Sequence, residues 1–150
     1  MKPKWMEIAE KEIGQKEIRG EENPRIIEYH STTTLKAKED EVPWCSAFVN
    51  WCIVQAGIIG TNSAAAKSWL SWGEEIDVPV PGCICVIHKK VKGEDKSTGS
   101  SSGYHVAFYR REDANRIWLL GGNQGNQVKE TSFSFLNYEV CGYRMPDNNV

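Results

Sequence analysis

The chain has 150 residues, 40% of them hydrophobic, which is the size and composition of one domain with a substantial core. Lysine and arginine total 18 against 20 aspartates and glutamates, so the net charge is −2. The basic residues do not cluster into a stripe along the sequence. These values exclude a typical nucleic-acid-binding protein. The longest apolar run is far below the roughly 20 residues of a membrane-spanning helix, so we expect no membrane span.

The first third of the chain predicts short helices joined by polar turns. Apolar residues recur at i, i+3, i+4 and i+8 over residues 3–13, which predicts a helix there, and Gly14 is a typical stop. Pro24 suits the first turn of a second helix over about 24–30. The polar, aperiodic segment 31–41 is expected to be a loop.

The strongest helical pattern covers residues 45–57. Its apolar side chains lie on one face and Gly57 follows the last of them. A further helix is predicted over 64–73, again ending at a glycine.

Beyond Val78 the pattern changes to β-structure. The segment 92–103 is rich in glycine and serine and predicts a mobile loop, and 112–116 predicts a hairpin turn. Because helices come first and a meander of strands follows, the chain is predicted to be a single α+β domain over residues 1–150 with an antiparallel sheet of about five strands. The predicted strands are 83–89, 104–111, 116–122, 128–133 and 140–146.

Cys45 lies at the predicted start of the 45–57 helix. Unpaired N–H groups at a helix N-terminus favour a thiolate, so this position suits a nucleophile, although an isolated cysteine is more often a buried apolar residue. Cys52, seven residues on and on the apolar face, is interpreted as packing. A thiol nucleophile needs an imidazole partner. Of the three histidines, His105 begins a strand just after a loop, where functional sites tend to lie.

The segment GGNQGNQ, 121–127, offers a third polar group at the end of the next strand. An amide there is able to accept a hydrogen bond from the imidazole, although a turn rich in glycine and asparagine is the simpler interpretation. Cys83, Cys85 and His88 have a spacing that could hold zinc, but structural zinc sites usually show two close ligand pairs. We expect no metal and no cofactor, and five cysteines without a paired framework indicate free thiols.

Six stretches in order carry a family resemblance: PWCSAFVNWC, KSWLSWG, PGCICVI, HVAFY, LLGGNQGNQV and GYRMP. Together they resemble the NlpC-like and CHAP-type cysteine peptidases and amidases, which cleave bacterial cell-wall peptides. The resemblance covers about residues 3–146 and is greatest with a compact subfamily found in phage lysins and cell-wall-targeting proteins. It implies a papain-like fold.

The resemblance also implies site roles. Cys45 would be the nucleophile, His105 the general base and Asn123 the residue that orients the imidazole, with Gln124 as the alternative. The Cys45 backbone N–H would donate to the oxyanion. Four further residues are expected to contact substrate in the cleft, Trp44, Ser46, Trp69 and Trp72, although core packing is at least as good an interpretation of each tryptophan.

The expected function is therefore a peptidoglycan hydrolase, either an endopeptidase or an N-acetylmuramoyl-L-alanine amidase. A papain-fold toxin or effector acting on a protein, as protease, deamidase or transglutaminase, is the alternative. The N-terminus lacks the apolar core of a signal peptide. We thus expect synthesis in the cytoplasm and action on the wall, in the periplasm or outside the cell, after release by a phage holin or a dedicated secretion apparatus. The secretion route would imply a cognate immunity or inhibitor protein.

Overall fold

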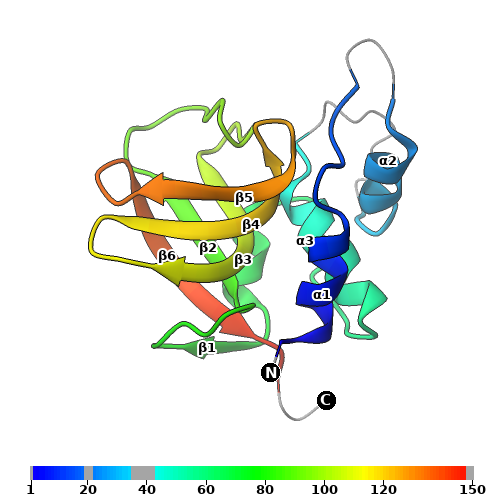
Figure 1. Ribbon diagram of the computed structural model, residues 1–150, viewed down its shortest axis with the longest axis horizontal. Coiled ribbons are helices and arrows are strands. Elements are labelled where there is room, and N and C mark those ends of the chain that lie inside the picture. The colour runs from blue at the N-terminus through cyan, green and yellow to red at the C-terminus, as the bar shows by residue number, and fades with distance from the viewer. Residues whose placement is uncertain (1, 19–21, 35–42, 148–150) are drawn as a thin grey trace.

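The computed structural model describes residues 2–18, 22–34 and 43–147. They form an α+β structure in which three α-helices gather beside one antiparallel sheet with strand order β1-β6-β2-β3-β4-β5 (Figure 1). The α+β prediction is confirmed. The helices are α1 (Lys4–Lys11), α2 (Pro24–Ser31), α3 (Cys45–Gln55) and the 3₁₀ helix η1 (Ala66–Ser71), and the strands are β1 (Glu74–Ile76), β2 (Ile84–Lys89), β3 (Tyr104–Glu112), β4 (Arg116–Gln124), β5 (Gln127–Ser134) and β6 (Tyr138–Met145).

Two of the predicted elements differ in the structure, and a third is mostly not described. The sheet has six strands rather than five, because the short β1 pairs with the end of β6. The helix predicted over 64–73 is only a six-residue 3₁₀ helix. The loop predicted over 31–41 lies mostly outside the described residues.

Helix α3 is the centre of the larger core. All of its residues from Cys45 to Ile53 are buried, so it has no solvent-facing side until its last turn. It packs on β3 and β4, and α1 and α2 cover it. A helix enclosed on all sides needs apolar residues around its whole circumference, which explains why a single apolar face was too narrow a prediction.

A second core lies on the other face of the sheet. The strands curl so that β4 and β5 cross in front of β2 and β6 (Figure 1), and the side chains between them close a separate apolar cluster. Its buried members include Cys83, which directly precedes β2, Cys85 from β2 and Phe133 from β5. Because both faces of the sheet are covered, residues that alternate along β3 belong to two different environments.

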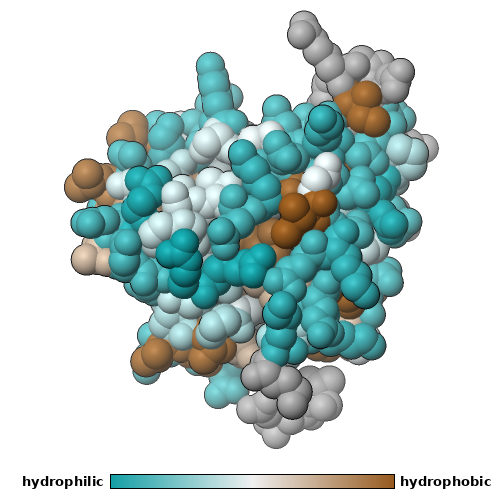
Figure 2. Space-filling view, in the orientation of Figure 1, coloured by the Kyte–Doolittle hydropathy of each residue, from teal (hydrophilic) through white to brown (hydrophobic). Residues whose placement is uncertain are grey.

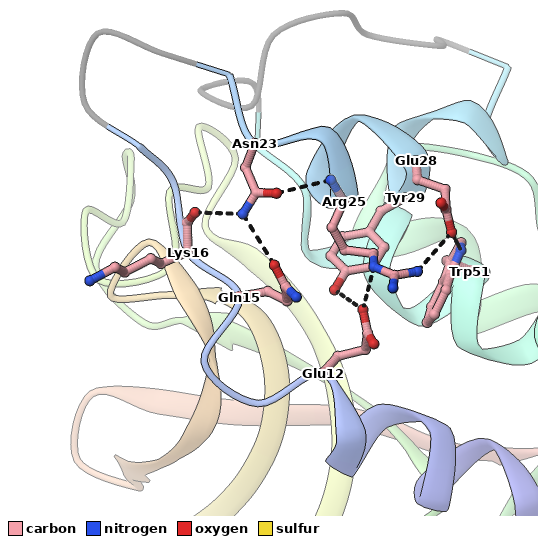
Figure 3. Close-up of polar contacts among 8 residues, drawn as sticks. All are labelled: Glu12, Gln15, Lys16, Asn23, Arg25, Glu28, Tyr29 and Trp51. Carbon is pink, nitrogen blue, oxygen red and sulfur yellow. Dashed lines mark hydrogen bonds and ion pairs between the residues drawn. The ribbon is translucent and has the colours of Figure 1, made fainter.

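Polar contacts anchor α2 to the segment after α1 (Figure 3). Asn23 caps α2: its side-chain Oδ1 accepts a hydrogen bond from the backbone N–H of Arg25 at 2.9 Å. Its Nδ2 donates to the carbonyl of Lys16 and to Oε1 of Gln15. Pro24 follows as the first helical residue, where its missing N–H is no loss.

The same cluster reaches α3 (Figure 3). The Tyr29 hydroxyl donates to the buried carboxylate of Glu12 at 2.7 Å, and Arg25 lies 3.3 Å from the same carboxylate. Glu28 accepts from the indole N–H of Trp51 at 2.8 Å. These contacts connect α2 both to the end of α1 and to the middle of α3.

The face of the molecule over β4 and β5 is mostly hydrophilic, and an apolar patch interrupts it near the N-terminal helix (Figure 2). Within the described part of the chain, every helix is too short or too polar to cross a bilayer.

Candidate active site

Cys45 is the first residue of α3, as predicted, and Trp44 occupies the N-cap. The side chain is buried, with 5% of its surface exposed. Burial raises the pKa of the thiol, and the backbone of Val106 and the N–H groups of Ser46 and Cys45 offset this only in part. The expectation that the helix N-terminus would lower this pKa is therefore wrong for the substrate-free state, because desolvation outweighs the first-turn N–H groups.

The contact with Val106 places the thiol beside the start of β3. Pairing between β3 and β4 ends at Phe108 and Leu120. The sulfur reaches the backbone of β3 beyond this point, one residue from His105. Helix and strand thus place the Cys45 sulfur against the backbone of the residue that follows His105, a position about 60 residues away in the sequence.

His105 is fully buried and lies on the face of β3 opposite α3. Val106 and Phe108 belong to the core around α3, whereas Ala107 belongs to the second core. Alternation along the strand puts His105 with Ala107. The imidazole packs against Phe133 with 5.7 Å between ring centroids.

Gln124 is the hydrogen-bond partner of the imidazole. Its Oε1 lies 2.9 Å from His105 Nε2. Its Nε2 donates to two carbonyls, those of Leu119 and Lys129, at 3.2 and 2.7 Å. Because both acceptors require the amide N–H₂, Oε1 must face the histidine, and His105 Nε2 must carry the proton.

This arrangement leaves Nδ1 as the basic nitrogen of His105. Nδ1 is buried and has no hydrogen-bond partner among the described residues. Burial lowers the pKa of His105 to about 4, although Gln124 and Asp95 act in the opposite direction. The imidazole is therefore neutral at pH 7, with a lone pair available on Nδ1.

The hydrogen-bond partner of the imidazole is Gln124, the alternative named from the sequence, and not Asn123. Asn123 has φ of 60°, a left-handed conformation that interrupts the strand. Its amide packs against Gly99 instead, where any Cβ would collide with it. The expectation that only one of the two residues is able to face the imidazole assumed a regular strand; the left-handed Asn123 interrupts that regularity, and Gln124 is the residue that faces the imidazole.

The two glycines of GGNQ lie within β4 and each makes room for a neighbour. A Cβ at Gly121 would lie 2.6 Å from Gln124 Oε1, and a Cβ at Gly122 would lie 2.7 Å from the Trp44 ring. Glycine inside a strand often marks such close approach, and this signal was available in the sequence. The turn interpretation of this segment applies only to residues 125 and 126.

A cleft of about 480 Å³ opens beside Cys45. Small side chains form much of its wall, and Lys67 contributes a cation 5.4 Å from the centroid of the Tyr104 ring. Sequence reasoning missed this wall, because serines and alanines in loops carry no distinctive pattern. The lining residues are Pro43, Cys45, Ala64, Ala65, Ala66, Lys67, Ser100, Ser101, Ser102 and Tyr104.

The four residues predicted to contact substrate are not part of this wall. Trp44 and Trp69 are fully buried. Ser46 donates to the carbonyl of Ser63 and accepts from the Trp69 indole N–H at 2.9 Å. Trp72 packs edge-on against Trp69 and donates to a carbonyl of the preceding loop. Their observed contacts are internal packing and hydrogen bonds, since an aromatic side chain near a site is not necessarily exposed to it.

The other four cysteines are also free thiols: three of them are buried in the two cores, and Cys141 is exposed. Cys52 is buried in the larger core, and Cys83 and Cys85 are buried in the second core. His88 stacks on Tyr104, on the face of the sheet away from both of these cysteines. In the described ranges, no group of three or more histidines, cysteines or carboxylates is placed to hold a metal ion.

The site therefore combines a thiol at a helix N-terminus, a neutral imidazole on the adjacent strand and an amide that fixes the imidazole tautomer. Such a set is able to perform nucleophilic acyl transfer. No protein-family model matches this sequence, and no curated protein matches it either.

Proposed function

We propose that this protein is a papain-like cysteine hydrolase that cleaves amide bonds in bacterial peptidoglycan. The observation that carries the proposal is His105: it is buried, its Nε2 proton is committed to Gln124, and its basic Nδ1 has no hydrogen-bond partner in the described part of the chain. A buried, unpaired base is costly to stability and is typical of a catalytic group. It lies one residue from the backbone position that the Cys45 sulfur contacts.

The chemistry starts from a neutral pair, because burial favours thiol over thiolate and imidazole over imidazolium. As the sulfur attacks the amide carbonyl, Nδ1 takes the thiol proton; this step requires the imidazole and the sulfur to come within hydrogen-bonding distance when substrate is bound. The backbone N–H of Cys45, in the first turn of α3, is free of intrahelical bonding and donates to the oxyanion. The imidazolium then protonates the leaving amine, and water, deprotonated by the same nitrogen, releases the acyl group.

The substrate class rests on the ordered motifs from PWCSAFVNWC to GYRMP and on the cleft. A wall of small residues beside Cys45 accommodates a branched peptide more readily than a narrow apolar pocket would. We place the activity in the cell wall, reached through a holin or a secretion apparatus. A papain-fold effector with a protein substrate shares the same catalytic steps.

Incubation with purified peptidoglycan, followed by mass spectrometry of the soluble fragments, tests the proposal. The wild type should release fragments with one new amine and one new carboxyl terminus, and their identity shows which bond is cut. Cys45→Ala and His105→Ala should release none while keeping the wild-type circular-dichroism spectrum. Cys52→Ala is the matched control, because this cysteine belongs to the same helix and only packs.

The outcomes separate the candidates. Cleavage of a protein but not of peptidoglycan would favour the effector. Near-full activity in Cys45→Ala would contradict the assignment of Cys45 as the nucleophile. A folded but inactive Cys52→Ala would assign that role to Cys52 instead.

A further inference from the structure

The loop 92–103 is closed by backbone contacts around Asp95. The Asp95 N–H donates to the Ser100 carbonyl at 2.7 Å, and the Ser100 N–H donates back at 3.1 Å. Asp95 and Thr98 are buried in spite of the loop's polar composition. The mobile loop predicted from glycine and serine content is thus a compact turn with a buried carboxylate inside it.

The carboxylate of Asp95 is held on both oxygens. Oδ1 accepts from the backbone N–H and the hydroxyl of Ser97, at 3.1 and 2.7 Å. Oδ2 accepts from the Tyr138 hydroxyl at 2.7 Å. Burial alone would raise the pKa of Asp95, but these hydrogen bonds lower it below its usual value. The carboxylate is therefore ionised at neutral pH, and only 4% of the residue's surface is exposed.

Two sets of contacts connect this charge to His105. Through the rings, Tyr138 packs edge-on against Phe133 at 5.0 Å, and Phe133 packs against the imidazole. Through the backbone, the Ser97 carbonyl accepts from the N–H of Gly125 at 3.0 Å, directly after Gln124. The loop thus holds the turn that positions the imidazole partner.

We propose that Asp95 is a positioning residue of the site: it fastens the 92–103 loop against the end of β4 and supplies the fixed negative charge that stabilises the His105 imidazolium. The first role concerns Gln124, because the loop is bonded to the residue that directly follows it. The second rests on the proposed function, because the imidazolium forms only when the Cys45 proton is transferred. The carboxylate raises the pKa of His105, against the stronger effect of burial.

Other titratable groups near this end of the sheet have different placements. Cys45 comes from α3 and Tyr138 from β6, and both are neutral at pH 7 because burial raises the pKa of each. His88 and Tyr104 stack on the opposite face. Lys129 of β5 has its ammonium 3.0 Å from the Cβ position of Gly125, beyond Gln124. Among the described groups, Asp95 is the charge that acts on His105.

NMR titration of the imidazole tests the charge without any assay of hydrolysis. Asp95→Asn removes the charge and keeps the shape, and His105→Gln identifies the resonance. We expect the His105 pKa to fall by about one unit in Asp95→Asn and to stay near the wild-type value in Asp95→Glu. If Asp95→Asn does not fold, Asp95→Ser replaces it, because a serine hydroxyl is still able to accept from the Ser97 N–H. An unchanged His105 pKa in the folded neutral variant overturns the proposal.

Kinetics separate positioning from structure. In Asp95→Asn, kcat should fall about tenfold with KM changed by less than about twofold, since a one-unit pKa shift corresponds to a tenfold change. Tyr138→Phe is the control that keeps the charge and removes one hydrogen bond, so its kcat should fall less. Equal losses in both variants would show that only the fold of the loop matters and would reject the charge. Full activity in Asp95→Asn, with Cys45→Ala inactive, would reject the inference and leave the proposed function standing.

Discussion

Gln124 binds the imidazole of His105 through Oε1 while its own N–H₂ is shared between the carbonyls of Leu119 and Lys129. The amide cannot rotate by 180° without placing N–H₂ against the Nε2 proton and Oε1 against two carbonyls. The sheet itself therefore selects the histidine tautomer. The pairing of β4 with β5 fixes the orientation of the Gln124 amide, and that orientation determines which nitrogen of His105 carries the proton.

Replacing Gln124 by alanine should lower kcat about 100-fold, because the ring then loses its preferred tautomer and orientation. Asn123→Gly is the matched control: glycine accepts the positive φ of that position and removes the neighbouring amide. Its kcat should stay within about threefold of wild type. Steady-state kinetics on a soluble cell-wall peptide measure both, and the reverse ranking of the two variants would return the orienting role to Asn123.

The rate should depend on pH with an acid limb near pH 4. The general base must be unprotonated, and burial lowers the pKa of His105 to about 4. Thus kcat/KM should rise as pH increases through about 4 and be level through neutrality, whereas an exposed imidazole would place the limb near 6.5. A profile of kcat/KM from pH 3.5 to 8 measures where the rate rises. A rise between pH 6 and 7 would show that the free enzyme exposes the imidazole to water.

Stability should depend on pH through the same residue. The unfolded chain binds a proton at His105 with a pKa near 6.5, but the folded protein binds it only near 4. The free energy of unfolding should therefore fall as pH decreases from about 6.5 to about 4, by about 3 kcal/mol from this group, and level off below. Urea denaturation at pH 7 and pH 4.5 measures the loss. His105→Gln should lose less than wild type over that interval, and equal losses would contradict the buried neutral imidazole.

Sequence patterns predicted the α+β order, the start of α3 at Cys45 and the hairpin of β3 and β4, because each depends on local periodicity or a nearby turn. They did not decide between Asn123 and Gln124, since a left-handed residue within β4 shifts which side chain faces the sheet. The thiol pKa was misjudged for a similar reason: the helix N-terminus is visible in sequence, whereas burial arises only when β3 covers it. Asp95 was overlooked because its neighbours are polar.

Gly121→Ala should reduce both stability and activity. The added Cβ would lie 2.6 Å from Gln124 Oε1 and 2.7 Å from Ala107 Cβ, so the amide must move away from the imidazole. Overpacking of this kind costs roughly 1–3 kcal/mol, and kcat should fall at least about tenfold. Gly142→Ala in β6 is the control, because its Cβ would lie 3.3 Å from the flexible end of Leu70. Thermal denaturation and initial rates should show a clear difference between the two variants, and equal effects would remove the specific role of Gly121.

A tryptophan at position 65 should block the cleft without disturbing the catalytic residues. Ala65 is exposed and lines the wall beside Cys45, so a large side chain there occupies space that substrate needs. We expect kcat/KM to fall about tenfold, mainly through a higher KM, while the free energy of unfolding changes by less than about 0.5 kcal/mol. Ala114→Trp, in the exposed turn between β3 and β4, controls for an added surface tryptophan. Unchanged KM in Ala65→Trp, measured on the released peptide fragments, would mean that the substrate approaches Cys45 from a different side.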